Sequence, residues 1–141
     1  MAPMDDPFRS TRAALDTLRS ATPVLIVDMH GEATSEKMAM GWYLDGKASA
    51  VIGTHTHVPT ADERILAGGT AYITDVGMTG SFDSVIGMEK DAALARFLTH
   101  MPERLSSAQK DSRLCGVVLD IDDATGRPRS IDRLMVNDGD A

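Results

Sequence analysis

The chain has 141 residues, enough for one compact domain, and we treat residues 1–141 as a single unit. Its 21 acidic and 14 basic residues give a formal charge of −7, and the sequence holds no run of Lys and Arg. We therefore expect no binding to duplex nucleic acid, because phosphate backbones are met by clustered basic side chains. No stretch approaches the roughly 18 apolar residues of a membrane helix, and the first residues do not resemble a signal peptide. We therefore expect a cytoplasmic protein with no membrane partner.

The first part of the chain predicts a helix followed by a buried strand. Asp6 before Pro7 is typical of a helix start, and we expect this helix to run to about Ala21. The continuous apolar run 24–27 is typical of a strand buried on both faces. It leads into the polar residues 28–31, so a loop with exposed functional groups should follow the strand.

A second helix and strand follow. Thr34 or Ser35 can cap a helix that runs to about Leu44 and is apolar nearly all round, which predicts that it is well buried. Residues 48–53 then predict a short strand. The sequence thus describes a strand, a helix and a strand, the unit that places two parallel strands side by side.

The remaining elements complete a mixed α/β chain. We expect a hairpin with a glycine turn, a glycine-rich loop, a helix with Leu94, Phe97 and Leu98 turned inward, and a final antiparallel strand pair. These elements span, in that order, residues 64–74, 75–87, 89–100, and 114–121 with 130–136.

Three of the four histidines follow the two predicted parallel strands. His55 and His57 are two residues apart, so in an extended backbone their imidazoles would point to the same face. His30 follows the neighbouring strand, and the carboxyl ends of parallel strands meet at one edge of the sheet. Three imidazoles at such an edge suit Zn, Mn or Fe, with Asp28 and Glu32 as residues that orient them. The alternative for each histidine is a structural or surface role.

Contiguous motifs then resemble one known family. They are Asp-Met-His-Gly-Glu-Ala-Thr-Ser-Glu-Lys at 28–37, Gly-Trp-Tyr-Leu-Asp-Gly at 41–46, Gly-Thr-His-Thr-His-Val at 53–58, Thr-Ala-Asp-Glu-Arg-Ile-Leu at 60–66 and Thr-Asp-Val-Gly-Met-Thr-Gly at 74–80. Together they resemble the calcineurin-like metallophosphoesterases, in the bacterial branch that includes 2',3'-cyclic-nucleotide phosphodiesterases. The resemblance runs from about Asp5 to Asp138.

The resemblance implies a fold and a metal site. It implies the C-terminal half of a layered α/β/β/α metallophosphoesterase sandwich, with the N-terminal half of the family domain outside this chain. It implies that His30, His55 and His57 bind part of a site for two metal ions, and that the protein forms a homo-oligomer. The family's bridging aspartate and general acid have no counterpart in the 141 residues, so we predict no catalytic residue here and expect the chain alone to be inactive or very weak.

Two hypotheses about function follow. The first is metal-dependent hydrolysis of a small phosphodiester, with 2',3'-cyclic nucleotides as the substrate class that the resemblance implies. Asp75 and Gly77, in the glycine-rich loop, are candidates for substrate binding, although a turn-forming role explains Asp75 equally well. The second hypothesis is an inactive relative that acts as a metal-binding or oligomerisation module. His100 is expected at a helix carboxyl end, outside the metal site.

Overall fold

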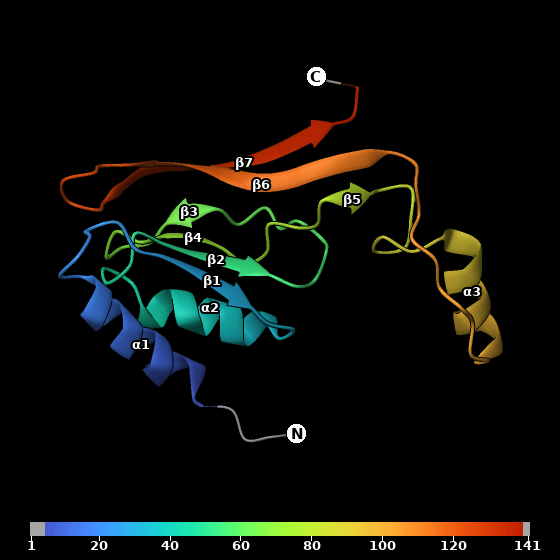
Figure 1. Ribbon diagram of the computed structural model, residues 1–141, viewed down its shortest axis with the longest axis horizontal. Helices are drawn as coiled ribbons and strands as arrows, with labels where there is room; N and C mark the ends of the chain where they lie inside the picture. The colour runs from blue at the N-terminus through green and yellow to red at the C-terminus, as the bar shows by residue number, and fades with distance from the viewer. Residues whose placement is uncertain (1–4, 140–141) are drawn as a thin grey trace.

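The computed structural model describes residues 5–139, which form an α/β/β arrangement. Helices α1 (Pro7–Leu18) and α2 (Thr34–Tyr43) lie on one face of a four-stranded sheet, and a three-stranded sheet lies on the other (Figure 1). Within residues 5–139 no helix has both the length and the apolar character needed to cross a membrane. The layering confirms the predicted α/β class.

The start of α1 follows from its capping residue. The Asp6 carboxylate accepts hydrogen bonds from the backbone N–H groups of Phe8 and Arg9, at 2.9 and 3.3 Å. Pro7 occupies the first turn, where a missing N–H costs nothing. The predicted start is therefore confirmed, but the helix ends at Leu18, three residues before the predicted end.

The four-stranded sheet places the ends of the first two strands side by side. Its strands are β1 (Ile26–His30), β2 (Ala50–Thr54), β3 (Arg64–Ile65) and β4 (Ala71–Ile73), in the order β1-β2-β4-β3. β1 and β2 are parallel, and His30 is in register with Thr54. β3 and β4 form the predicted antiparallel hairpin.

The prediction that the first strand is buried on both faces is wrong. Val27 and Met29 of β1 pack against the core between the sheet and the two helices, but Ile26 on the opposite face is 56% exposed. β1 is an edge strand, and the second sheet contacts β3 and β4 rather than β1. One face of β1, which also carries His30, is therefore open to solvent.

The second helix is buried on one side only, so the expectation of a helix that is well buried nearly all round is wrong. Lys37, Met40 and Gly41 are buried, whereas Trp42 is exposed. A Cβ on Gly41 would lie 2.5 Å from the Tyr72 ring, so glycine is what allows α2 to approach the sheet this closely. The expected cap at Thr34 or Ser35 is wrong: both residues lie inside the helix, whose N-cap is Ala33 and has no side-chain hydrogen bond.

The second sheet consists of β5 (Gly80–Ser81), β6 (Ser112–Ile121) and β7 (Pro128–Asn137). β6 and β7 form the predicted antiparallel pair, whereas β5 lies in the segment expected to be loop. Ala50, Ala71 and Ile73 of the first sheet meet Ile131 of β7 in a buried cluster. This apolar contact holds the two sheets together.

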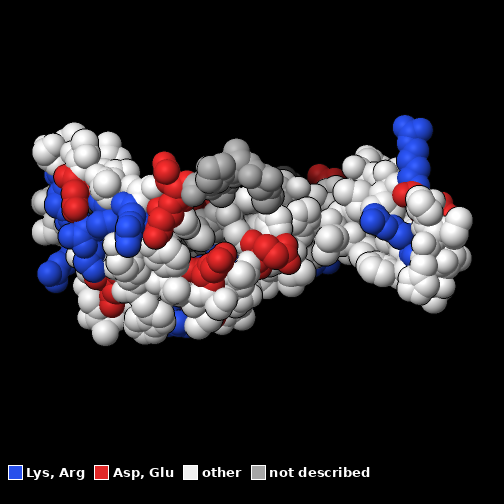
Figure 2. Space-filling model, turned by 90° about the horizontal axis from the view of Figure 1, so that it is seen from below, with Lys and Arg blue, Asp and Glu red and all other residues white. Residues whose placement is uncertain are grey.

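Helix α3 (Lys90–Thr99) stands apart from the layered body (Figure 1). Leu94, Phe97 and Leu98 were expected to face inward, but Phe97 and Leu98 are 70% and 79% exposed and Leu94 is exposed as well. Only Ala93 of the helix is buried. Seen from below, the region of α3 forms a lobe that a narrow segment joins to the layered body (Figure 2). A group of Lys and Arg side chains lies at the opposite end of the molecule.

Candidate metal centre

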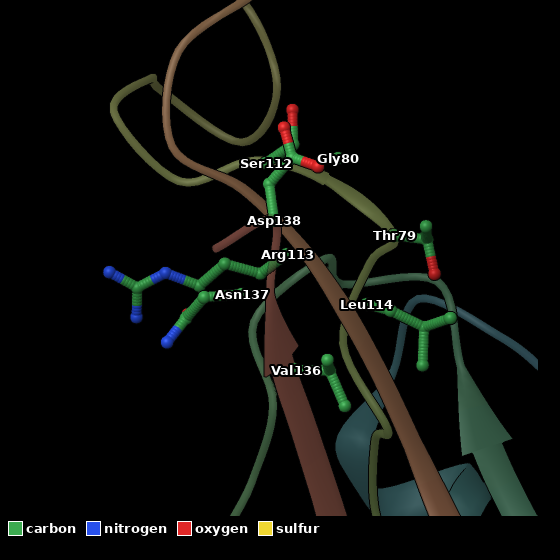
Figure 3. Close-up of a pocket in the computed structure, with 8 residues that line it drawn as sticks. All are labelled: Thr79, Gly80, Ser112, Arg113, Leu114, Val136, Asn137 and Asp138. Atoms are coloured by element: carbon green, nitrogen blue, oxygen red, sulfur yellow. The ribbon is translucent and has the colours of Figure 1, made fainter. Parts of the chain in front are cut away.

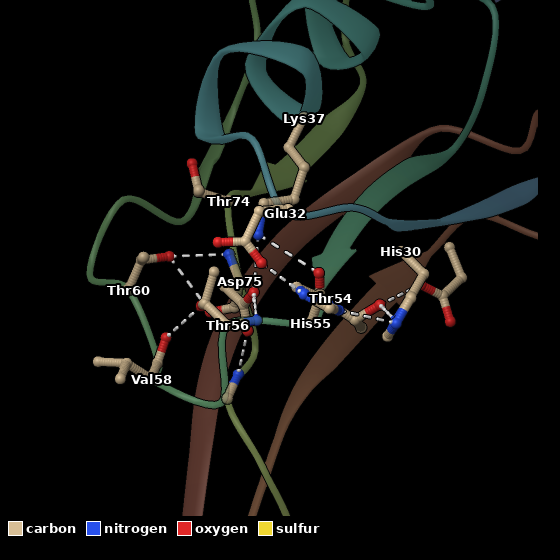
Figure 4. Close-up of polar contacts among 12 residues, drawn as sticks. His30, Glu32, Lys37, Thr54, His55, Thr56, Val58, Thr60, Thr74 and Asp75 are labelled. Carbon is tan, nitrogen blue, oxygen red and sulfur yellow. Dashed lines mark hydrogen bonds and ion pairs between the residues drawn. The ribbon is translucent and has the colours of Figure 1, made fainter. Parts of the chain in front are cut away.

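The structure brings His30 and His55 into direct contact at the open edge of the sheet. Nε2 of His30 lies 3.0 Å from Nδ1 of His55, and the two rings meet edge to face with centroids 4.8 Å apart. His30 is the last residue of β1, and His55 follows the last residue of β2 (Figure 4). The parallel pairing of these strands therefore produces the contact, as the sequence predicted.

The outer nitrogen of His55 bonds to a carboxylate, and that of His30 bonds to a hydroxyl that itself donates to a carboxylate. Thr54 donates its hydroxyl proton to Asp28 at 2.8 Å, so its oxygen accepts from Nδ1–H of His30 at 3.0 Å. Nε2 of His55 lies 2.7 Å from the Glu32 carboxylate, which can only accept. Each ring therefore carries its proton on the outer nitrogen.

With both rings neutral, this assignment leaves a lone pair on each of the two facing nitrogens. Two lone pairs 3.0 Å apart repel each other unless a proton or a metal cation lies between them. Two nitrogens that bind one cation at about 2.0–2.1 Å are separated by about 2.9 Å where they meet it at right angles and by about 3.3 Å in a tetrahedral site. The spacing and the tautomers of His30 and His55 thus fit a shared metal ion.

His57 is not brought to this pair. Its Nδ1 lies 2.9 Å from the carbonyl oxygen of Ile86, in the loop before α3. The expectation that His55 and His57 share a face assumed an extended backbone, but β2 ends at Thr54 and φ is +114° at His55 and +67° at His57. Across residues 5–139, no group of three or more His, Cys, Asp or Glu side chains is arranged to hold a metal ion.

The positive φ angles mark a strained loop. Residues other than glycine adopt such angles at a cost of about 1–3 kcal/mol each, and the surrounding structure must hold them there. Two of the three residues 55–57, both histidines, adopt such angles, and angles of this kind persist only where surrounding contacts hold the backbone. Strain of this kind is concentrated at functional sites.

A buried ion pair beneath the loop supplies such contacts. Nζ of Lys37 lies 2.8 Å from Oδ2 of Asp75, and both side chains are fully buried. Asp75 also accepts from the backbone N–H groups of Thr56 and Gly77, each at 2.9 Å (Figure 4). Burial by itself would raise the pKa of Asp75. The hydrogen bonds from Lys37 and from these N–H groups lower the pKa by more than burial raises it, so the net pKa lies below the usual value.

The candidates for substrate binding therefore have structural roles here. Asp75 has no exposed surface, and both of its carboxylate oxygens accept hydrogen bonds from the protein. The side chain is therefore not placed to contact a substrate. Gly77 has φ of +86°, and a Cβ there would lie 2.9 Å from the Pro59 side chain. The turn-forming alternative accounts for both residues.

The sequence did not single out Lys37, Thr54 or Thr56 at this site. Lys37 offered one signal, because it is a lysine within a helix that is otherwise largely apolar. A second network continues from the loop, in which the Asp62 carboxylate accepts from the Thr60 hydroxyl and from the backbone N–H of Thr74. His100 lies at the end of α3 with φ of +57°, as a helix-terminal residue.

One surface hollow lies beside the predicted site, and another lies away from it. One, of about 410 Å³, lies beside His57 and is lined mainly by apolar residues, including Pro59, Met78 and Phe82. The other, also about 410 Å³, lies between the ends of β5, β6 and β7, next to Thr79 and Arg113 (Figure 3). No residue of the predicted metal site lines the second hollow.

The chain is similar to known phosphodiesterases and phosphatases. A family model described as YmdB-like protein matches residues 1–134. A 2',3'-cyclic-nucleotide 2'-phosphodiesterase of Bacillus subtilis (strain 168) is 51% identical over 138 residues, which make up 98% of this chain and 52% of that protein. A putative phosphatase/phosphodiesterase of Mycoplasma pneumoniae is 40% identical over 118 residues, 83% of this chain and 41% of that protein.

Solved structures show the same arrangement. A hypothetical protein from Thermus thermophilus is 47% identical with a TM-score of 0.89, over 97% of this chain and 53% of that one. A novel phosphatase from Mycoplasma pneumoniae is 35% identical with a TM-score of 0.86, over 96% of this chain and 50% of that one. The chain thus spans about half the length of these relatives.

Proposed function

The chain belongs to the YmdB-like protein family, and on that premise we propose that it supplies metal-binding imidazoles to a phosphodiesterase. The proposed substrates are small phosphodiesters, with 2',3'-cyclic nucleotides first, the class in the name of the Bacillus subtilis relative. The proposed metal ligands are His30 and His55, whose nitrogens face each other, together with His57, whose ring lies beside Ile86 and not against this pair. The proposed ions are two, drawn from Fe, Mn and Zn, all of which accept imidazole nitrogen.

The observation that carries this proposal is the pair of facing nitrogens, 3.0 Å apart, on His30 and His55. The carboxylates of Asp28, through Thr54, and of Glu32 hold the protons on the outer nitrogens. Histidines that bind metals ordinarily donate their second N–H to such partners. This arrangement supports metal binding more directly than a structural role, which would need no matched pair of acceptors.

The proposed division of labour follows from charge. A bound cation supplies Lewis acidity, which stabilises negative charge on phosphoryl oxygens during hydrolysis. The imidazoles of this chain are neutral ligands and position that cation, while Glu32 and Asp28 add negative charge just outside them. The bridging carboxylate and the general acid that the family resemblance implies are absent from this sequence, so we propose that turnover requires further residues.

The test measures metal binding first and turnover second. We expect the purified chain to bind Mn²⁺ in calorimetric titration, and His30→Ala or His55→Ala to weaken that binding at least tenfold. His100→Ala is the matched control and should leave affinity unchanged. Equal Mn²⁺ uptake by the wild type and a His30→Ala/His55→Ala variant would refute the proposed metal site. Turnover of 2',3'-cyclic AMP by this chain alone would refute the proposal that catalysis requires further residues.

The second candidate function is a metal-binding or self-associating module without turnover. The exposed apolar side of α3, formed by Leu94, Phe97 and Leu98, favours it, because monomeric proteins seldom present such a contiguous surface. A homo-oligomer through this surface is compatible with the first function as well. Measured turnover is what separates the two.

A further inference from the structure

We propose that the buried Lys37–Asp75 ion pair is a positioning device that sets the backbone of the loop 54–57 and thereby aims His55 at His30. The proposal rests on the proposed metal site for its functional meaning. Its geometric part, that the pair determines where the His55 imidazole lies, can be tested without any metal. Neither residue contacts an imidazole, so both act through the loop.

The bonds of the pair reach the backbone on both sides of His55. Nζ of Lys37 donates to the carbonyl oxygen of Thr54 at 3.3 Å, and Oδ2 of Asp75 accepts from the N–H of Thr56 at 2.9 Å. The two charged atoms are themselves 2.8 Å apart. The residues before and after His55 are therefore fixed to a single buried point, and the φ of +114° at His55 lies between them.

Asp75, which follows β4, also holds the chain just beyond the loop. Oδ1 of Asp75 accepts from the N–H of Gly77, and the carbonyl oxygen of Asp75 accepts from the N–H of Thr60 at 2.9 Å. Gly53 makes room for this packing, because a Cβ there would lie 1.7 Å from the Thr74 carbonyl oxygen and 3.1 Å from Cδ of Lys37. Gly53 therefore lies at the point where the Lys37 side chain packs over β2.

Stability alone does not account for a pair in this place. Both side chains have no exposed surface, and moving two charges out of water costs about as much as their attraction returns. Apolar residues of similar volume often serve a core equally well or better. What an apolar pair would not supply is a donor for Thr54 and an acceptor for Thr56, the groups that hold the strained loop.

The decisive variant is therefore Lys37→Met/Asp75→Val, which keeps the core filled and removes both charges. We expect it to fold, as judged by circular dichroism, and to bind Mn²⁺ about 10–100-fold more weakly than the wild type. Thr70→Val is the matched control: Thr70 is fully buried and bonds to Leu44 and Ala48, away from the loop. It should lower stability without changing Mn²⁺ affinity.

A second measurement keeps the proposal separate from the metal hypothesis. In metal-free protein, the imidazole ¹⁵N and ¹H shifts of His30 and His55 report their mutual contact. We expect the double variant, and Asp75→Asn, to shift both sets of signals, and Thr70→Val to leave them in place. If the wild type binds no Mn²⁺, the metal-site hypothesis is refuted, but the imidazole shifts still test whether the ion pair positions His55.

A double-mutant cycle closes the test. In a His55→Ala background, Lys37→Met/Asp75→Val should weaken Mn²⁺ binding no further, because its effect passes through His55. Wild-type affinity together with unchanged imidazole shifts in the folded double variant would overturn the proposal. Should that variant not fold, Asp75→Asn with unchanged shifts would overturn it equally.

Discussion

His30 and His55 are 25 residues apart in the chain, yet their Nε2 and Nδ1 atoms lie 3.0 Å from each other. The parallel pairing of β1 with β2 accounts for this proximity, since His30 is in register with Thr54. The partners of the outer nitrogens come from the same two strand ends and from Glu32. The site is thus assembled within one strand–helix–strand unit.

We predict that the partners of the two imidazoles matter for metal binding. Thr54→Val removes the acceptor of the His30 proton, and Glu32→Gln replaces the charged acceptor of the His55 proton with a neutral amide, so each should weaken Mn²⁺ affinity about 10–100-fold. Glu36→Gln, on α2 and outside these hydrogen bonds, is the control. Unchanged calorimetric affinity in both site variants would contradict the assigned tautomers.

The Asp75 carboxylate should couple stability to acid pH. Its pKa in the folded protein is below 3.8, so its contribution is present above that pH and is lost as pH falls through the folded pKa. Asp75→Asn, which leaves Lys37 without its counter-charge, should cost about 3–5 kcal/mol at pH 7. It should also flatten the decline of unfolding free energy below pH 4.

Urea unfolding between pH 7 and pH 3 measures both effects. Thr70→Val serves as the control, since it removes no titrating group and should lower stability by the same amount at every pH. A decline of equal slope in the wild type and Asp75→Asn would show that Asp75 does not supply the acid dependence.

Gly53 should be intolerant of any side chain. A Cβ there would lie 1.7 Å from the Thr74 carbonyl oxygen, so Gly53→Ala should destabilise the fold by about 1–3 kcal/mol or more. Gly116→Ala in β6 is matched to it, because no atom lies within 4 Å of the added Cβ. Its unfolding free energy should stay within about 0.5 kcal/mol of the wild type.

The apolar side of α3 should contribute to association rather than to folding. Phe97→Ser should change the unfolding free energy of the monomer by no more than about 0.5 kcal/mol, as is usual for exposed positions. Met40→Ala, at a fully buried position, should cost about 2–5 kcal/mol. In sedimentation velocity, Phe97→Ser is expected to shift any self-association toward monomer; a large loss of monomer stability would show that Phe97 is buried.

The sequence by itself determined the elements and the meeting of two histidines. Asp6 and Pro7 set the start of α1, the apolar runs set β1 and β2, and the helix between them made the strands parallel neighbours. These features depend on local preferences and on residue spacing, which a single sequence displays. The contact between His30 and His55 follows from them.

Only the tertiary structure decided where His57 and α3 point and what Lys37 does. The positive φ angles of His55 and His57 lie in a loop that is bonded to Asp75 and Ile86, which are far along the chain. Likewise, the sequence pattern of an apolar helical face is the same whether or not another segment covers that face, so burial of α3 could not be predicted from it. Backbone strain and burial arise from contacts between distant segments, and no local pattern encodes them.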